Sequence, residues 1–94
     1  MATSTIKYKK QNYLLTGGKT SSSDDCNDFE SWSAYMCSSS VKNVPLSGSW
    51  AMVFTIWSFG TFNKMQIGLS VGSTKKLYHR YYDNGAWTSW VAAD

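Results

Sequence analysis

Hydrophobic and polar residues alternate over most of the second half of the chain, which is the pattern of β-strands rather than of helices. The clearest case is Leu77 to Val91, where two runs of strand-forming residues flank Asp83, Asn84 and Gly85. An Asn-Gly pair readily takes the positive φ angles that a tight hairpin turn requires. The pattern therefore predicts a β-hairpin with its turn at these three residues.

Alternation also assigns the side chains of this hairpin to two faces, because successive residues of a strand point in opposite directions. The first arm divides into Leu77, His79 and Tyr81 against Tyr78, Arg80 and Tyr82. The second arm divides into Trp87, Ser89 and Val91 against Thr88 and Trp90. Both faces carry large rings. Since an isolated hairpin is marginal in water, the rest of the chain is expected to cover at least one face.

Three segments upstream are predicted to be strands as well. Ser49 to Phe59 is apolar on both faces, which indicates a central strand or one whose face meets another subunit. Met65 to Val71 alternates between apolar residues and small or polar ones, which predicts a strand whose core face is Met65, Ile67, Leu69 and Val71. Ala34 to Cys37 predicts a shorter strand.

The first third of the chain is more polar. Ile6 and Tyr8 alternate with lysines, which suits an edge strand, and residues 1–18 are expected to be a strand of the domain or the entry from an upstream shaft. Residues 19–94 are expected to form the β domain. The acidic start of Asp24 to Trp32 favours one short helix of about two turns there.

Five to six strands, one short helix and regularly spaced turns predict a mainly β fold, a small antiparallel sheet or sandwich. A single domain of 94 residues hides only about two-thirds of its unfolded surface, so it needs large side chains. Five Trp, six Tyr and four Phe meet that need. Five tryptophans are more than so small a core holds centrally, so some are expected at the surface or in a subunit contact.

Charge, cysteines and hydropathy exclude several classes. The net charge of +3 is small and scattered, which argues against nucleic-acid binding. No apolar run approaches transmembrane length, so no membrane insertion is expected. Cys26 and Cys37 match no zinc or redox spacing, and partly buried thiols are favoured over a disulfide between them. No metal and no other cofactor is expected.

Candidate catalytic groups are few. His79 is the only histidine, and it lies in mid-strand without the turn that a Ser-His-acid site needs. The other possible enzyme is a small polysaccharide hydrolase, which needs a pair of carboxylates. The candidates for such a pair are Asp24, Asp25, Asp28 and Glu30. Their position at the start of a helix favours capping and solvation instead. We therefore expect a protein that is not an enzyme.

The surplus of aromatic residues favours binding. A flat ring can bury the apolar face of a sugar while neighbouring polar side chains satisfy its hydroxyl groups. The candidate ligand-binding residues gather in the predicted hairpin: Arg80, Tyr82, Asp83, Asn84, Trp87 and Trp90. For each tryptophan, packing in a core or an interface is the alternative interpretation.

A series of short motifs also runs along most of the chain in a definite order. Its members are DDCNDF at 24–29, Tyr35, NVP at 43–45, QI at 66–67, LYHRY at 77–81 and WTSW at 87–90. In order and spacing this series resembles the pyocin-knob family of phage and tailocin tail-fibre domains, over about residues 22–91. The chain departs from the family pattern before Tyr35, where a glycine is common, and in its unusually aromatic segment Trp50 to Phe59.

The resemblance implies a small β knob, carried on the trimeric fibres of a contractile tail, that contributes to attachment to the bacterial surface. It implies a structural signature of Asp25, Asn27, Tyr35, Asn43, Pro45 and Gln66. Arg80, Trp87 and Trp90 also match signature positions, which favours a role in holding the fold.

We therefore expect a homotrimeric virion protein, made in the cytoplasm of a bacterial host, that binds a surface glycan. The alternative is a head-fibre, decoration or baseplate protein that binds other virion proteins without affinity for glycans.

Overall fold

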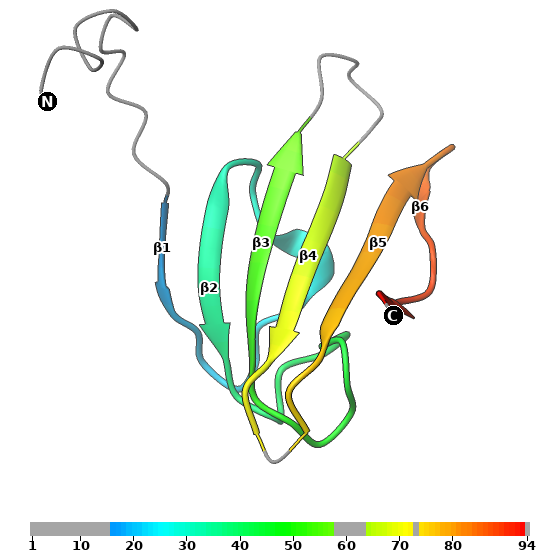
Figure 1. Cartoon of the computed structure of the whole chain (residues 1–94). Helices are drawn as coiled ribbons and strands as arrows, with labels where there is room; N and C mark the ends of the chain where they lie inside the picture. Colours follow the sequence, from blue (N-terminus) through cyan, green and yellow to red (C-terminus); the bar gives the residue numbers. More distant parts are fainter. Residues whose placement is uncertain (1–15, 58–63, 73, 94) are drawn as a thin grey trace, which may run out of the picture.

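The computed structural model describes residues 16–57, 64–72 and 74–93. Within them, seven strands form one sheet in the order β1-β2-β3-β4-β5-β6, and β7 also pairs with β5 (Figure 1). The strands are β1 (Thr16–Lys19), β2 (Ser33–Cys37), β3 (Ala51–Trp57), β4 (Lys64–Ser70), β5 (Leu77–Asp83), β6 (Ala86–Trp87) and β7 (Val91–Ala92). The mainly β class predicted from the sequence is confirmed.

The pairing is antiparallel except at one edge. β1 runs parallel to β2, so the chain leaves the edge strand and crosses over through residues 20–32 before it enters β2. β3 lies in the middle of the sheet, as its two apolar faces predict. The alternation at Ile6 and Tyr8 and the predicted strand end at Phe59 lie outside the described residues.

The short helix expected from Asp24 to Trp32 is reduced to one 3-10 turn, η1 (Cys26–Asp28). Asp25 caps this turn, because its Oδ1 accepts a hydrogen bond of 2.8 Å from the backbone N–H of Asn27. Trp32 then has a φ of 61° and donates its N–H to the carbonyl of Thr55 at 2.8 Å. The helix does not continue to Trp32, because the N–H of Trp32 is already hydrogen-bonded to Thr55 of β3.

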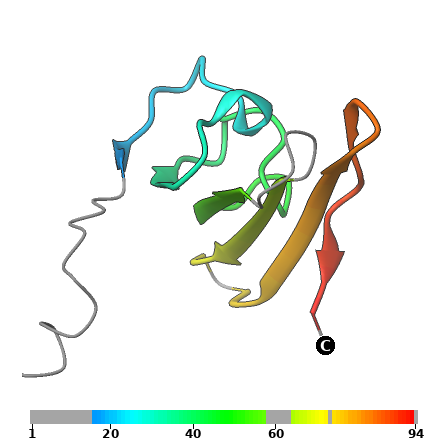
Figure 2. The same ribbon diagram turned by 90° about the horizontal axis from the view of Figure 1, so that it is seen from above.

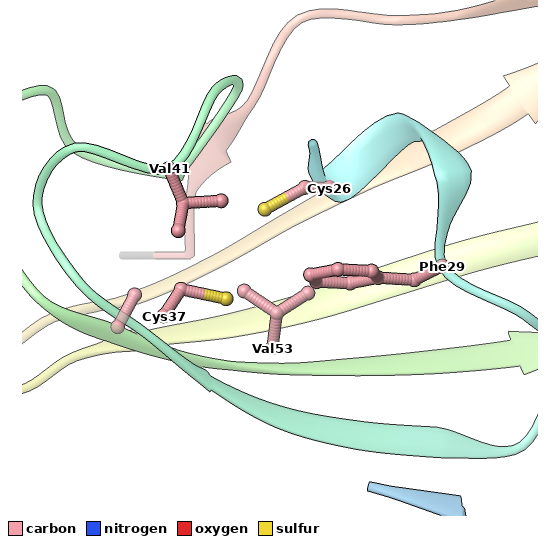
Figure 3. Packing of buried hydrophobic residues seen from close by; sticks show 6 residues of the cluster. Cys26, Phe29, Cys37, Val41 and Val53 are labelled. Carbon is pink, nitrogen blue, oxygen red and sulfur yellow. The ribbon is translucent and has the colours of Figure 1, made fainter. Parts of the chain in front are cut away.

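The two faces of the sheet differ. Figure 2 shows that segments 20–32 and 38–50 both lie on one side, which we call the closed face. The buried apolar cluster lies between these segments and the sheet (Figure 3). Its members are Cys26, Phe29, Cys37, Val41, Ala51 and Val53, with Tyr35, Val44 and Trp90 packed against them.

On the opposite side, which we call the open face, side chains from five strands stand in register. The open face consists of Ala34, Met36, Met52, Phe54, Ile56, Met65, Ile67, Leu69, Leu77, His79, Tyr81 and Val91. Leu69, Leu77, Tyr81 and Val91 are between 39% and 51% exposed, and the others are partly buried. No described segment lies over them (Figure 2).

The orientation of β4 corrects the prediction from its hydrophobic pattern. The pattern places Met65, Ile67 and Leu69 in the core, but the structure buries Gln66, Gly68 and Ser70 on the closed face. Gln66 finds three hydrogen-bond partners there, and the lack of a side chain at Gly68 leaves room for Pro45. Specific polar and steric partners outweigh the general preference for burying apolar side chains.

The predicted hairpin is confirmed, with Asn84 and Gly85 at φ angles of 54° and 85°. Its second arm does not keep the predicted alternation. Residues 88–90 are not part of a strand. The N–H of Thr88 donates to the carbonyl of Tyr81, and the hydroxyl of Thr88 accepts a hydrogen bond from the N–H of Tyr81. Trp87 and Trp90, which alternation places on opposite faces, therefore both contact the same residue, Arg80.

Cys26 and Cys37 are buried free thiols, in line with the favoured interpretation of the sequence. Figure 3 shows their sulfur atoms directed into the same part of the core. A hydrogen bond with Cys37 and burial raise the pKa of the Cys26 thiol, so this group stays protonated at neutral pH.

Gly68→Ala tests the closeness of this packing. A Cβ atom at this position would lie 2.3 Å from Cγ of Pro45 and 3.2 Å from the ring of Trp90. We expect the free energy of unfolding to fall by about 1 to 3 kcal/mol, because the ring of Pro45 has to move. Urea denaturation measures it. Gly72→Ala is the control, since its Cβ atom would approach only the side chain of Ser49; equal losses in both variants would contradict this account.

Candidate functional site

Arg80 occupies the centre of the site. It lies on β5 with only 4% of its surface exposed, although arginine is one of the residues least often buried. Its guanidinium carbon lies 4.4 Å from the ring centroid of Trp87 and 4.7 Å from that of Trp90. The two indole rings thus replace water with cation–π contacts. Burial lowers the pKa of Arg80 to about 10, so the group remains positively charged at neutral pH.

Gln66 of β4 supplies the polar contacts that this buried cation needs. Its Oε1 accepts a hydrogen bond of 2.8 Å from Nε of Arg80. Its Nε2 donates to the carbonyl of Cys26 at 2.8 Å and to the hydroxyl of Thr55 at 3.0 Å. One fully buried amide therefore links η1, β3 and β5, and each of its bonds is shielded from water.

The two tryptophans connect Arg80 to the segments that cover the closed face. Nε1 of Trp87 donates to the carbonyl of Asn27 at 3.3 Å, and Nε1 of Trp90 donates to the carbonyl of Asn43 at 2.9 Å. Each ring contacts the guanidinium with its face and a loop with its polar edge. The C-terminal arm of the hairpin is thereby attached to both covering segments.

Asp25 joins these two segments to each other. Its Oδ1 accepts hydrogen bonds of 2.8 Å from the N–H of Asn27 and from Nδ2 of Asn43. Burial raises the pKa of the Asp25 carboxyl, but these bonds and the charges of Lys42 and Arg80 outweigh burial. The pKa therefore lies below its ordinary value, and the carboxylate is ionised in the folded protein.

We call this set of connected residues the Arg80 network: Asp25, Asn27, Asn43, Gln66, Arg80, Trp87 and Trp90. All seven belong to the motifs on which the family resemblance was based, and the fold brings them together from five of those motifs. Two further signature residues lie beside the network. The hydroxyl of Tyr35 donates to the carboxylate of Glu30 at 2.9 Å, and Pro45 is buried against Gly68.

A cleft of about 400 Å³ opens beside the network, a volume within the range of small-molecule sites. It is lined by Asn27, Asn43, Arg80, Trp87, Thr88, Ser89 and Trp90. Two tryptophans thus line it together with residues that carry amide or hydroxyl groups. In addition, the buried Nη2 of Arg80 has no hydrogen-bond partner among the described residues. The cleft thus combines apolar surface, hydrogen-bonding groups and one buried positive charge.

Three of the six predicted ligand residues, Arg80, Trp87 and Trp90, line this cleft. Tyr82 does not line the cleft, but its ring meets that of Trp87 edge to face, with 5.3 Å between the ring centroids. Asp83 and Asn84 are exposed at the hairpin turn and do not line it.

Four other residues line the cleft. Asn27 and Asn43 were predicted only as structural signature residues. Thr88 and Ser89 were not predicted, although two small polar residues between two tryptophans are a usable signal.

Aromatic surface is also present elsewhere. Trp32 and Trp50 are 51% and 41% exposed, which confirms that the tryptophans do not all belong to the core. His79 lies on the open face, where its ring meets Tyr81 at 5.7 Å and its Nδ1 has no hydrogen-bond partner in the described part of the chain. Across residues 16–57, 64–72 and 74–93 there is no cluster of three potential metal ligands and no helix able to span a bilayer.

No protein-family model, no curated protein and no solved structure matches this chain. The function is therefore argued from the geometry of the Arg80 network and its cleft, together with the motifs that this network contains.

Gln66→Leu tests the central amide. The substitution leaves Nε of Arg80, the carbonyl of Cys26 and the hydroxyl of Thr55 without this partner, so we expect a loss of about 3 kcal/mol or more in the free energy of unfolding. Chemical denaturation followed by tryptophan fluorescence measures it. Ile67→Leu, one residue further on the open face, is the control and is expected to lose less than about 1.5 kcal/mol. A gain in stability for Gln66→Leu would contradict the role given to the amide.

Asp25→Asn tests the carboxylate through pH. Because the folded pKa of Asp25 is below the unfolded value of 3.8, ionisation stabilises the fold above that pH and this stability is lost as pH falls through the folded pKa. The variant keeps an acceptor but has no charge to titrate. We expect it to be less stable than the wild type at pH 7, with a difference that shrinks at low pH. A difference that stays constant on acidification would show that the charge is irrelevant.

Proposed function

We propose that this chain is a non-enzymatic knob domain of a fibre from a phage or phage-like particle, and that it contributes to attachment to a bacterial surface by binding glycan. The observation that carries the proposal is the Arg80 network. Five of the six motifs that resemble the pyocin-knob family contribute to one connected set of contacts, beside one cleft. Motifs that are far apart in the sequence are thus in contact in the fold, which supports reading them as one family pattern.

The cleft has the chemistry that a carbohydrate ligand needs. The indole rings of Trp87 and Trp90 offer apolar surface to the C–H groups of a sugar ring. Asn27, Asn43 and Ser89 offer groups that can donate or accept hydrogen bonds from hydroxyls. The rings are held by Arg80 and by the loop carbonyls, so little conformational entropy is lost when a ligand binds.

The same geometry supports a binding role rather than catalysis. His79 lies on the open face and the cleft on the closed face, so the histidine is not available to the cleft. Asp25 is held by two hydrogen bonds and ionised, which suits a structural carboxylate better than a general acid. The proposed protein is a virion component that is synthesised in the cytoplasm of the host and functions as a homotrimer.

Ser89→Tyr tests glycan binding. Ser89 is exposed at the wall of the cleft, so a tyrosine there fills the cleft without disturbing the network, and we expect binding to bacterial surface polysaccharide to weaken about tenfold or more. Binding of the purified protein to an array of extracted polysaccharides measures it. Ser47→Tyr, in an exposed loop away from the cleft, is the matched control and is expected to bind as the wild type does.

Two results would contradict attachment at this cleft. One is the absence of binding to every polysaccharide on the array. The other is binding that Ser89→Tyr leaves unchanged while the variant keeps the wild-type melting temperature.

A second candidate is a head-fibre, decoration or baseplate protein without affinity for glycan. The observation that favours it is the broad apolar surface of the open face, which suits a protein partner. Saturable binding to purified capsids or baseplates, without binding to cells or polysaccharides, would support this candidate over the first.

A further inference from the structure

The open face is a broad apolar surface that takes no part in the Arg80 network or in its cleft. The covering segments 20–32 and 38–50 are both on the closed face, and the buried apolar cluster lies entirely there. Large apolar side chains, among them Phe54, Met65 and Ile67, are only partly buried on the other side, where no described segment covers them. A domain this small gains little stability from one face alone, so covering the second face stabilises it.

The composition of the open face is that of a protein interface. Three of the four methionines of the chain, Met36, Met52 and Met65, lie on it, and methionine adapts its shape to a partner and is enriched in interfaces. Among the described strand residues of this side, the charged ones lie at opposite ends of the sheet: Lys19 on β1 and Asp83 at the end of β5. An apolar centre with charges at the rim results.

The size of the face suits association as well. Across the strands the face spans four spacings of about 4.8 Å, and along the strands it spans three residue pairs of about 6.8 Å. With the width of the outer side chains, these dimensions give a flat area of roughly 500 Å². This is at the upper end of the largest apolar patches of ordinary monomers, which reach about 600 Å². Two such faces pressed together bury roughly 1,000 Å², which is the lower limit for a specific interface.

We propose that the open face is the surface through which copies of this chain associate. A second copy presents the same surface, and because none of its residues is Lys, Arg, Asp or Glu, no charge of these residues is buried when two faces meet. Sheets pack face to face at a separation of about 10 Å through interdigitated side chains of this kind. Two identical patches that meet face to face are related by a twofold axis, so the contact closes as a pair of chains instead of growing into an open fibre.

This inference rests on the proposed function only for the expectation that copies of the chain associate. It differs in number, because a face-to-face contact joins two copies where the proposed function expects three. Because the cleft and the open face lie on opposite sides of the sheet, the two roles do not compete for surface. They are also independently testable, since a change in the cleft leaves the open face intact.

Ile67→Lys tests the inference in the full chain. Ile67 lies between Phe54 and His79 in the central row of the face, so a lysine there places an unpaired charge in the middle of the interface. We expect the wild type to show a mass of two or more chains by light scattering after size exclusion, and Ile67→Lys to show the mass of one. Ser39→Lys, which adds the same charge to an exposed loop outside the face, is expected to keep the wild-type mass.

A second variant separates loss of association from loss of folding. Tyr81 is 48% exposed on the open face, so we expect a single chain with Tyr81→Lys to fold as the wild type does. The variant is expected to associate more weakly, so that it is already dissociated at protein concentrations at which the wild type is still assembled. Circular dichroism checks that each variant is folded.

Two outcomes would overturn the inference. A wild-type chain that has the mass of one copy would do so, because no second copy would then cover the face. An assembly that survives both lysine variants would place the contact elsewhere. Ser89→Tyr is expected to leave the mass unchanged, so failure of glycan binding and failure of association are distinguishable.

Discussion

The burial of one positive charge, that of Arg80, imposes the main constraint on this fold. A guanidinium removed from water is costly unless aromatic faces and hydrogen-bond acceptors replace the solvent. Here Trp87 and Trp90 enclose it and Gln66 accepts from its Nε. Each of these partners is bonded in turn to a covering loop or to β3. The position of the loops, the path of the C-terminal arm and the orientation of β4 all depend on this arrangement.

The same constraint explains the unusual distribution of polar and apolar residues. Once Gln66 is turned inward to meet Arg80, the alternation of β4 turns Met65, Ile67 and Leu69 outward. The neighbouring strands pair with β4 in register, so their own apolar residues extend the same surface. A polar network on the closed face therefore leaves an apolar surface on the open face. In the function proposed here, ligand attachment and self-association use these opposite sides.

How well the sequence predicted these features depends on the range of the interactions involved. The Asn84-Gly85 turn and the central position of β3 were predicted correctly, because a turn preference and two apolar faces are properties of the segment itself. Arg80, Trp87 and Trp90 were identified as a candidate site, but the alternation rule placed Trp87 and Trp90 on opposite faces. The interruption at Thr88 overrides alternation, and it depends on bonds to Tyr81 in the other arm.

By itself the sequence determined the mainly β class, the hairpin and the residue types able to bind a sugar, since backbone preferences and side-chain chemistry are local. Only the tertiary structure decided which face of β4 is buried, how far the helix extends and which residues line the cleft. These outcomes rest on partners distant in the chain, such as Gln66 with Cys26 and Trp90 with Asn43. The alternation of side chains along a strand predicts two faces, but the contacts available on each side of the sheet decide which face is buried.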